Sequence, residues 1–110
     1  MTIGGESLRL LVATTPEQRS QGLRGVDDLG DYDGMAFVYA EPTEATFTMA
    51  DTTIPLDIGF YDGTGDVVNR LEMVPCPGTD ATCPGYPSDA EFLVAVETPA
   101  GHLPSGPLGV

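Results

Sequence analysis

Four polar side chains near Pro55 are the first candidates for chemistry in this sequence. They are Thr48, Asp51, Thr52 and Asp57. Two carboxylates in one cleft can act as acid and base, or can hold a hydroxylated ligand beside threonine hydroxyls. In the structural alternative, Asp57 accepts hydrogen bonds from main-chain N–H groups or pairs with Arg19, because an unpaired buried carboxylate is costly. We interpret the four residues as a ligand-binding strip and assign no catalytic residue.

Other acidic residues and the lone histidine offer weaker candidates. Calcium prefers oxygen ligands, which four closely spaced carboxylates could supply: Asp27, Asp28, Asp31 and Asp33. Their spacing lacks the calcium-loop pattern with its terminal glutamate, so a solvated acidic turn is favoured. His102 lies in a Gly/Pro-rich segment, and the chain has no nucleophile elbow for a Ser–His–Asp arrangement. The sequence therefore predicts no metal and no cofactor.

The two cysteines, Cys76 and Cys83, flank six residues in a segment rich in proline and glycine. Redox motifs place two residues between their cysteines, and a zinc site would need two further ligands. A local disulfide is the prediction, and it implies an oxidising compartment. The opening residues MTIGGES have neither the charged nor the apolar region of a signal peptide. We therefore expect an extracytoplasmic protein, secreted or anchored at the cell surface, whose signal segment is absent from this sequence.

Charge and length restrict the function further. Among 110 residues, 17 acidic side chains face four cationic ones, all arginines, and the formal net charge is −13. Nucleic-acid affinity rests on lysines and arginines that neutralise phosphates, so nucleic acid is not an expected partner. No apolar run approaches the roughly 20 residues of a membrane-spanning helix. The length suits a single domain over residues 1–110.

Hydrophobic periodicity and turn residues predict the elements that must position the candidate site. Thr15 as N-cap, Pro16 at the first helical position and Gln18 predict a short helix from Pro16 to about Leu23. Residues 62–66 form a hairpin turn, and residues 75–90 an irregular loop. Short apolar or alternating segments predict six strands, at residues 7–14, 34–40, 45–49, 54–61, 67–74 and 91–98. The expected fold is mainly β: a compact antiparallel β sandwich or barrel-like domain with one short N-terminal helix.

Several of these segments, taken in order, resemble a known family. They are ATTPEQRSQGL, GMAFVY, FTMADTTIPLDIGFYDGTGDVV, EMVPCPG with Tyr86, and VETPAG. They resemble the domain-of-unknown-function 192 family of bacteria and archaea over about residues 8–101, most specifically in the IPLDI core and its flanks. The resemblance implies a small, mostly β domain, often exported or lipid-anchored, that has no established activity.

The chain departs from the family pattern next to the candidate site. Thr48, Ala50 and Asp51 stand where the family usually has Trp, Lys and Asn, and Arg24 and Val26 replace a methionine and an arginine. An activity that depended on that lysine is therefore not expected here. The tail after Gly101 is also short, which predicts a reduced last strand.

We predict a non-enzymatic binding or accessory module for a neutral polar ligand such as a glycan. One alternative is a small hydrolase that uses Asp51 and Asp57 as paired carboxylates. Another is a structural partner of a cell-envelope assembly. Apolar residues that could line a pocket are expected by default to pack in the core: Phe37, Phe47, Met49, Phe60 and Leu71.

Overall fold

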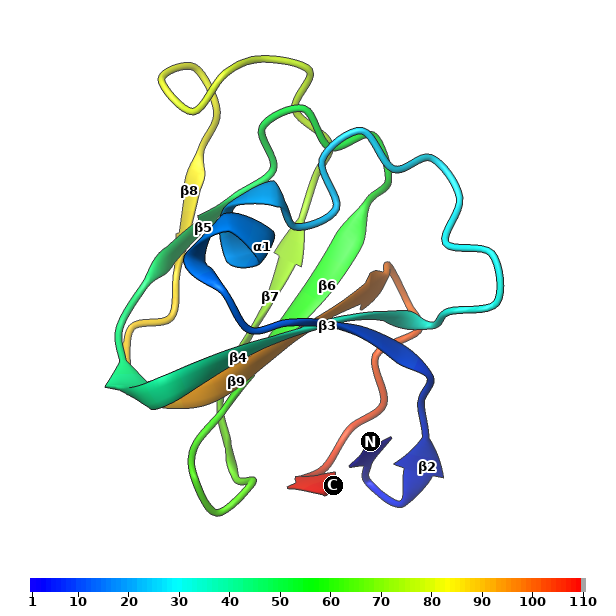
Figure 1. Ribbon diagram of the computed structural model, residues 1–110, viewed down its shortest axis with the longest axis vertical. Helices are drawn as coiled ribbons and strands as arrows, with labels where there is room; N and C mark the ends of the chain where they lie inside the picture. The colour runs from blue at the N-terminus through cyan, green and yellow to red at the C-terminus, as the bar shows by residue number, and fades with distance from the viewer. Residues whose placement is uncertain (110) are drawn as a thin grey trace.

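A twisted five-stranded sheet forms the centre of the molecule (Figure 1). The computed structural model describes residues 1–109. From one edge of the sheet to the other, the strands are β3 (Leu10–Ala13), β4 (Gly34–Thr43), β9 (Phe92–Pro99), β6 (Leu56–Tyr61) and β7 (Val67–Met73). The β3–β4 pair is parallel and the other pairs are antiparallel. The latest of these strands in sequence, β9, thus lies in the middle of the sheet.

Smaller elements lie on the two sides of this sheet (Figure 1). On one side are helix α1 (Pro16–Gln21) and an antiparallel pair formed by β5 (Thr46–Thr48) and β8 (Gly85–Pro87). On the other side is a three-stranded sheet of β10 (Leu108–Gly109), β1 (Thr2–Ile3) and β2 (Glu6–Ser7). Within residues 1–109, no helix has the length and apolar character needed to span a bilayer.

The prediction of a mainly β fold with one short helix is confirmed, but two of its details are wrong. The main sheet is not purely antiparallel, because α1 carries the chain between β3 and β4 and lets them run in the same direction. The sheets do not close into a barrel, since β3 and β7 remain edges. The sandwich form of the prediction is not confirmed. The loop predicted over residues 75–90 contains a short strand, β8.

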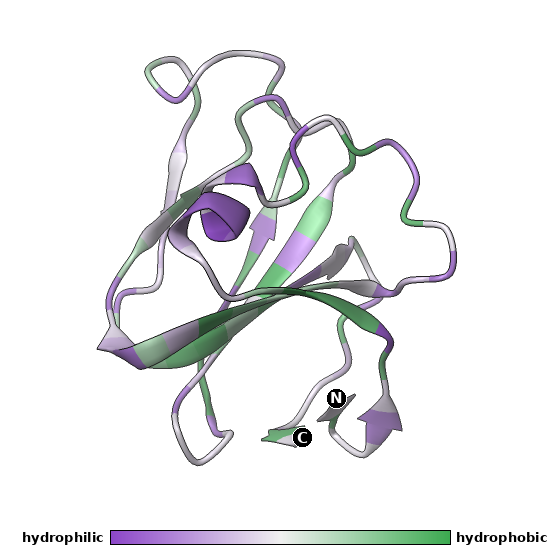
Figure 2. Cartoon of the chain, viewed as in Figure 1, coloured by the Kyte–Doolittle hydropathy of each residue, from purple (hydrophilic) through white to green (hydrophobic). Residues whose placement is uncertain are grey.

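Helix α1 begins where the sequence predicts. The Thr15 hydroxyl accepts a hydrogen bond from the Gln18 N–H, and the Gln18 side chain accepts one from the Thr15 N–H. The helix stops at Gln21 because Gly22 has a φ of 48°, which side chains rarely adopt. No residue of α1 is buried, and the helix is coloured hydrophilic in Figure 2. Hydrophobic burial of its own side chains therefore does not hold this helix in place.

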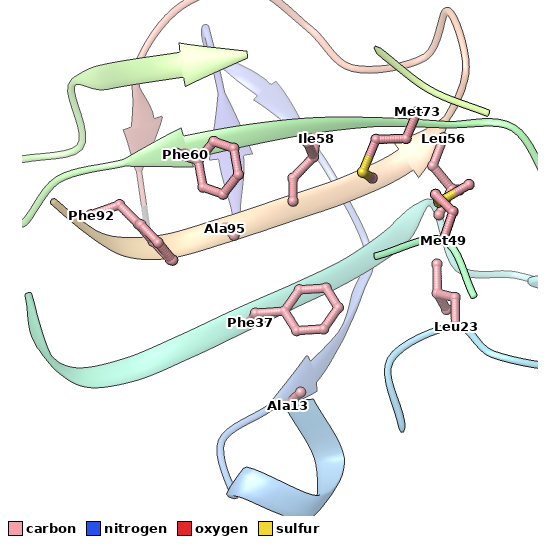
Figure 3. Close-up of a cluster of buried hydrophobic side chains, with 10 residues drawn as sticks. All are labelled: Ala13, Leu23, Phe37, Met49, Leu56, Ile58, Phe60, Met73, Phe92 and Ala95. Carbon is pink, nitrogen blue, oxygen red and sulfur yellow. The ribbon is translucent and has the colours of Figure 1, made fainter. Parts of the chain in front are cut away.

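Alternation along the strands builds two apolar clusters, one on each face of the main sheet. The larger cluster is shown in Figure 3 and contains Ala13, Leu23, Phe37, Met49, Leu56, Ile58, Phe60, Met73, Phe92 and Ala95. The smaller contains Ile3, Ala36, Tyr61, Val96 and Leu103. In β4, Phe37 belongs to the first cluster and Ala36 to the second, as the period of two predicts. The larger cluster lies on the side that carries α1 and β5.

A disulfide between Cys76 and Cys83 closes the loop before β8, as predicted. This disulfide loop (residues 76–83) contacts the segment after β5, because the Cys76 N–H donates to the Thr52 carbonyl and the Asp51 N–H donates to the Gly78 carbonyl. The cross-link therefore constrains more than its own loop.

Removing the disulfide is expected to lower the free energy of unfolding by roughly 2–3 kcal/mol, because the unfolded chain regains the entropy that the closed loop excludes. The test compares urea unfolding of the Cys76→Ser/Cys83→Ser double variant with that of the oxidised wild type. Reduced wild type serves as the control for the serine side chains and should match the double variant. Equal midpoints for oxidised and reduced protein would contradict the prediction.

Candidate functional site

A pocket of about 360 Å³ lies between α1, β5 and the main sheet, which is within the size range of small-molecule sites. Its lining combines apolar side chains with hydroxyls and three ionisable groups. The principal side chains are Arg19, Arg24, Phe37, Tyr39, Phe47, Thr48, Met49, Thr52 and Glu97. The sheet contributes Phe37, Tyr39 and Glu97, and β5 and the turn after it contribute the threonines. We call this the α1–β5 pocket.

Glu97 is a buried carboxyl in the middle of the sheet. It lies on β9 opposite Met35 of β4 and Ile58 of β6, so its side chain shares the face of the larger apolar cluster. Only 4% of the residue is exposed, and burial raises the pKa of Glu97 from 4.5 to about 8. Its carboxyl forms no salt bridge with any residue that the structure describes. At neutral pH Glu97 is therefore protonated, and it can both donate and accept a hydrogen bond.

On the neighbouring strand, the backbone of Gly34 comes unusually close to the main chain of Glu97. A Cβ atom at Gly34, at the start of β4, would lie 2.0 Å from the main-chain oxygen of Glu97. No side chain fits there without displacing a strand, so glycine is required for β4 and β9 to pair at this point. The position of Glu97 in the sheet thus depends on a specific residue of β4.

Arg19 connects α1 to the sheet at one wall of the pocket. Its Nη1 donates to the Thr14 carbonyl at 2.7 Å and to the Val38 carbonyl at 3.1 Å. The guanidinium also lies 4.4 Å from the centre of the Tyr39 ring, which is a cation–π distance. Burial raises the pKa of Tyr39, and the nearby Arg19 opposes the rise. These contacts explain how a helix without buried residues keeps a fixed place over the sheet.

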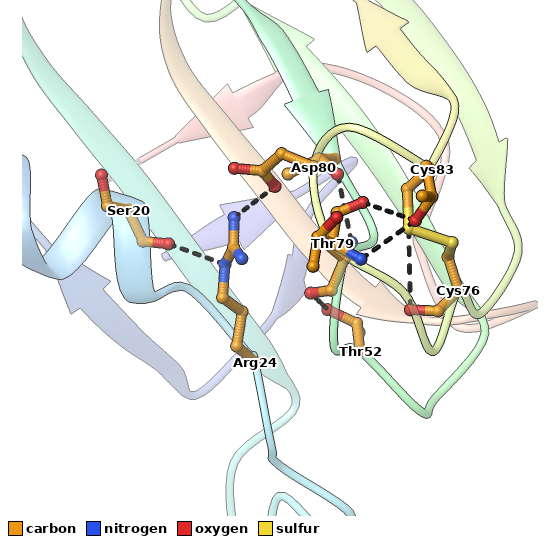
Figure 4. Close-up of polar contacts among 10 residues, drawn as sticks. Ser20, Arg24, Thr52, Cys76, Thr79, Asp80 and Cys83 are labelled. Atoms are coloured by element: carbon orange, nitrogen blue, oxygen red, sulfur yellow. Dashed lines mark hydrogen bonds and ion pairs between the residues drawn. A yellow bond between two sulfur atoms is a disulfide. The ribbon is translucent and has the colours of Figure 1, made fainter.

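Arg24 is the second arginine that lines the pocket, and it also contacts the disulfide loop (Figure 4). Its Nε donates to the Ser20 carbonyl at 3.1 Å, and its Nη2 forms an ion pair with Asp80 at 2.9 Å. Asp80 belongs to the disulfide loop and its side chain is 69% exposed. The Coulomb attraction of this exposed pair is weak, so the pair serves mainly to orient Arg24.

Two of the four residues of the predicted binding strip lie in this pocket. Thr48 and Thr52 line it, and both hydroxyls contact Ala50 between them. The Thr48 hydroxyl accepts a hydrogen bond from the Ala50 N–H at 3.1 Å, and the Thr52 hydroxyl donates to the Ala50 carbonyl at 3.2 Å. The Thr48 hydroxyl keeps its proton for a ligand, and the Thr52 oxygen keeps a lone pair.

The two aspartates of the strip lie elsewhere, and among residues 1–109 neither lines the α1–β5 pocket. Asp51 is exposed with a φ of 54°, and its carbonyl accepts a hydrogen bond from the Gly25 N–H. Asp57 points to the opposite face of β6 from Leu56 and Ile58, where it accepts a hydrogen bond from the Gly101 N–H at 2.9 Å. This is the main-chain contact that the structural alternative predicted, whereas Arg19 binds other partners.

The acidic turn and His102 lie together at a different hollow, also of about 360 Å³. The turn carboxylates make local contacts: Asp28 accepts from the Gly30 N–H, Asp33 from the Arg9 N–H, and Asp27 from the Thr53 hydroxyl. Among residues 1–109, no group of three or more His, Cys, Asp or Glu side chains is placed to hold a metal ion. These contacts give the acidic turn a structural role.

Sequence reasoning missed Glu97 as a site residue. The sequence did contain evidence for it, because Glu97 is the only ionisable residue of a mostly apolar segment, FLVAVETP. It shares the parity of Ala95, a core residue, so the period of two already directs its side chain into the core. A carboxyl at such a position needs a partner, a ligand or a proton.

The geometry supports binding better than group transfer. The α1–β5 pocket offers aromatic rings for an apolar surface, hydroxyls and a protonated carboxyl for hydrogen bonds, and two guanidinium groups at its walls. Acid–base chemistry by paired carboxylates would need a second acidic residue beside Glu97, and none lines the pocket among the described residues.

The fold is similar to that of two solved crystal structures. A protein of unknown function from Novosphingobium aromaticivorans DSM 12444 has a TM-score of 0.70 and 34% sequence identity, over 82% of this chain and 61% of that one. A protein from Sinorhizobium meliloti 1021, described as a candidate transcription regulator, has a TM-score of 0.72 and 26% identity, over 83% of this chain and 67% of that one. This chain therefore spans less than two thirds of the first structure's chain.

The family comparison agrees with the resemblance found in the sequence motifs. No curated protein matches the chain. The model of domain-of-unknown-function family 192, described as "Uncharacterized ACR", matches residues 1–105. This match covers nearly the whole sequence, and the chain belongs to this family.

Proposed function

We propose that this chain, as one domain, is a non-enzymatic module that binds a small polar ligand in the α1–β5 pocket. The observation that carries the proposal is Glu97, a buried carboxyl that faces the pocket with no salt-bridge partner in the described part of the chain. Burying such a group costs free energy, and a ligand that hydrogen-bonds to it would offset part of that cost. A neutral polar ligand such as a glycan, the class predicted from the sequence, remains a candidate.

The competing functions have less support from the geometry. The hydrolase alternative needs Asp51 and Asp57 in one cleft, whereas in the described part of the chain Asp57 lines a small hollow that does not include Asp51. A role in transcription, suggested by the description of the Sinorhizobium meliloti protein, would place this chain on nucleic acid. A net charge of −13 disfavours that contact.

The proposed location is extracytoplasmic. The Cys76–Cys83 disulfide supports it, because disulfides persist in oxidising compartments. The strongly acidic composition is also compatible with a cell-surface location, where a structural role in an envelope assembly would be the alternative to ligand binding.

The test is a thermal-shift and calorimetry panel of neutral sugars, amino sugars, nucleotides and small organic acids. A ligand at a hundred times its dissociation constant adds about 2.7 kcal/mol of stability, enough to raise the melting temperature of a domain of this size by on the order of 10 °C. Two variants locate the site. Thr48→Trp fills the α1–β5 pocket and should abolish binding, whereas Asp57→Asn lies outside it and should not affect binding.

Circular dichroism verifies that both variants fold. If binding persists in Thr48→Trp but is lost in Asp57→Asn, the ligand binds on the other face of the sheet and not in the α1–β5 pocket. No stabilisation by any compound of the panel would contradict a small-ligand function.

A further inference from the structure

We propose that the ligand of the α1–β5 pocket is a small hydroxylated carboxylate, whose anionic group binds Arg19 and Arg24 and whose hydroxyls reach Thr48, Thr52 and Glu97. This inference rests on the proposed binding function and assigns its ligand class. It changes the sequence-based expectation in one respect, because the ligand carries a negative charge.

The distribution of charge supports an anionic ligand. The chain has 17 acidic side chains and only four arginines, yet two of those arginines line this one pocket. The only acidic residue that lines the described pocket is Glu97. Because this carboxyl is protonated at neutral pH, it does not cancel the arginine charge. Arg24 pairs with the exposed Asp80 outside the pocket, whereas Arg19 has no acidic partner among the described residues and supplies the uncompensated positive charge. The pocket is therefore a locally cationic site in a strongly anionic protein, which would attract and orient a small anion.

Both guanidinium groups are held in place but keep donors for a ligand. Arg19 uses Nη1 for the Thr14 and Val38 carbonyls and lies beside Tyr39, and among the described residues its Nε and Nη2 donate to no main-chain carbonyl. Arg24 uses Nε for Ser20 and Nη2 for Asp80, which leaves Nη1. A planar guanidinium matches a carboxylate through paired N–H···O bonds. Fixing the arginines in advance lowers the entropy lost when the ligand binds.

The rest of the lining explains why hydroxyls are part of the proposed ligand. The Thr48 hydroxyl keeps a proton and the Thr52 oxygen keeps a lone pair, so the pair offers one donor and one acceptor. Protonated Glu97 adds one hydrogen-bond donor and one acceptor. The rings of Phe37 and Phe47 meet edge to face with centres 5.2 Å apart, and they offer apolar surface to the carbon skeleton.

Charged and titratable groups around Glu97 predict how pH affects binding. The pocket that Glu97 faces also presents Arg19 from α1, Arg24 from the turn after α1, and Tyr39 from β4. Neighbouring β6 presents Ile58 and β5 presents no ionisable side chain. As the pH rises through about 8, Glu97 becomes an anion and repels the bound carboxylate, so affinity should fall.

The experiment compares acids with their uncharged amides. Dissociation constants are measured by calorimetry at pH 6.5 and low salt for glucuronate, galacturonate, gluconate and lactate, each beside its amide. We expect at least one acid to bind at least tenfold more tightly than its amide, and this ratio to shrink in 0.5 M salt.

Arginine variants test whether the pocket provides this preference. Arg24→Gln should reduce the acid-to-amide ratio severalfold, and Arg19→Gln should do the same, with Arg19→Lys restoring part of it. Arg9→Gln is the matched control: this arginine lies over the Tyr32 ring, outside the pocket, and its loss should leave the ratio unchanged.

The outcomes separate this inference from the proposed function. Amides or neutral sugars that bind as tightly as the acids would overturn the carboxylate assignment but keep the binding function. An equal loss of ratio in Arg9→Gln would also overturn it, because only the overall charge would then matter. No binding of any compound at millimolar concentration would overturn both.

Discussion

Replacing Glu97 with glutamine is expected to stabilise the protein increasingly as the pH rises from about 4.5 to about 8. Burial raises the pKa of Glu97 from 4.5 to about 8, so between these values the folded protein holds a proton that the unfolded chain has released. The free energy of unfolding of the wild type then falls with pH, by about 1.4 kcal/mol per pH unit for this one group. Below pH 4.5 Glu97 is protonated in both the folded and the unfolded protein, so this loss of stability is absent.

Over the whole interval the cost amounts to at most about 5 kcal/mol, a large part of the stability of a typical small domain. The Glu97→Gln variant has no titrating group at this position and avoids the cost. Its advantage over the wild type should therefore grow between pH 4.5 and pH 8 and stay constant above. Urea unfolding at pH 4, 6 and 8 measures it.

The control is Glu91→Gln, the same change at an exposed position next to β9. It should show no such growing advantage. If the difference between Glu97→Gln and the wild type is the same at pH 4 and pH 8, then Glu97 is ionised in the folded protein and its proton cannot serve a ligand.

Truncating Phe60 is the second change with a large expected effect. Phe60 is fully buried, and its ring centre lies 5.0 Å from that of Phe92 and 5.6 Å from that of Phe47. Phe60→Ala should lower the free energy of unfolding by about 3–5 kcal/mol, because it leaves a cavity between the sheet and β5. Guanidinium unfolding measures the loss, together with a drop in melting temperature on the order of 10 °C or more.

Two controls bracket this prediction. Phe60→Leu keeps most of the volume and should cost clearly less than the alanine variant. Val12→Ala removes methyl groups from a side chain that is 51% exposed, and should change stability by no more than about 0.5 kcal/mol. A cost below about 1 kcal/mol for Phe60→Ala would mean that this aromatic cluster is loosely packed.

Much of the fold could be predicted from local signals. The capping residues around Thr15 and Gln18 located α1, and alternation located the longer strands to within a few residues. The strands that sequence reasoning missed are β1, β2, β8 and β10, which are two or three residues long. Such segments are too short to show a period. The parallel pairing of β3 with β4 was also out of reach, because periodicity reports which face a residue occupies and not which strand lies beside it.

The site was predictable only in part, and for reasons that specific residues illustrate. Sequence analysis predicted Thr48 and Thr52 as binding residues, and both line the pocket. It grouped Asp57 with them because the two segments are close along the chain. Strand alternation separates them, since Asp57 lies between Leu56 and Ile58 and so points to the other face. Glu97 is 45 residues from Thr52, and only the pairing of β9 with β4 and β6 brings it near.

The central place of β9 in the sheet also determines when the main sheet can form during folding. Until residues 92–99 exist, β4 and β6 each have a free edge toward the gap, and the main sheet remains in two separate parts. Closing that gap requires contacts between residues far apart in sequence, which is characteristic of domains that fold in milliseconds to seconds. On the ribosome, the main sheet would therefore assemble only after this late segment emerges. Glu97 arrives with it, so the lining of the α1–β5 pocket is incomplete until the main sheet has formed.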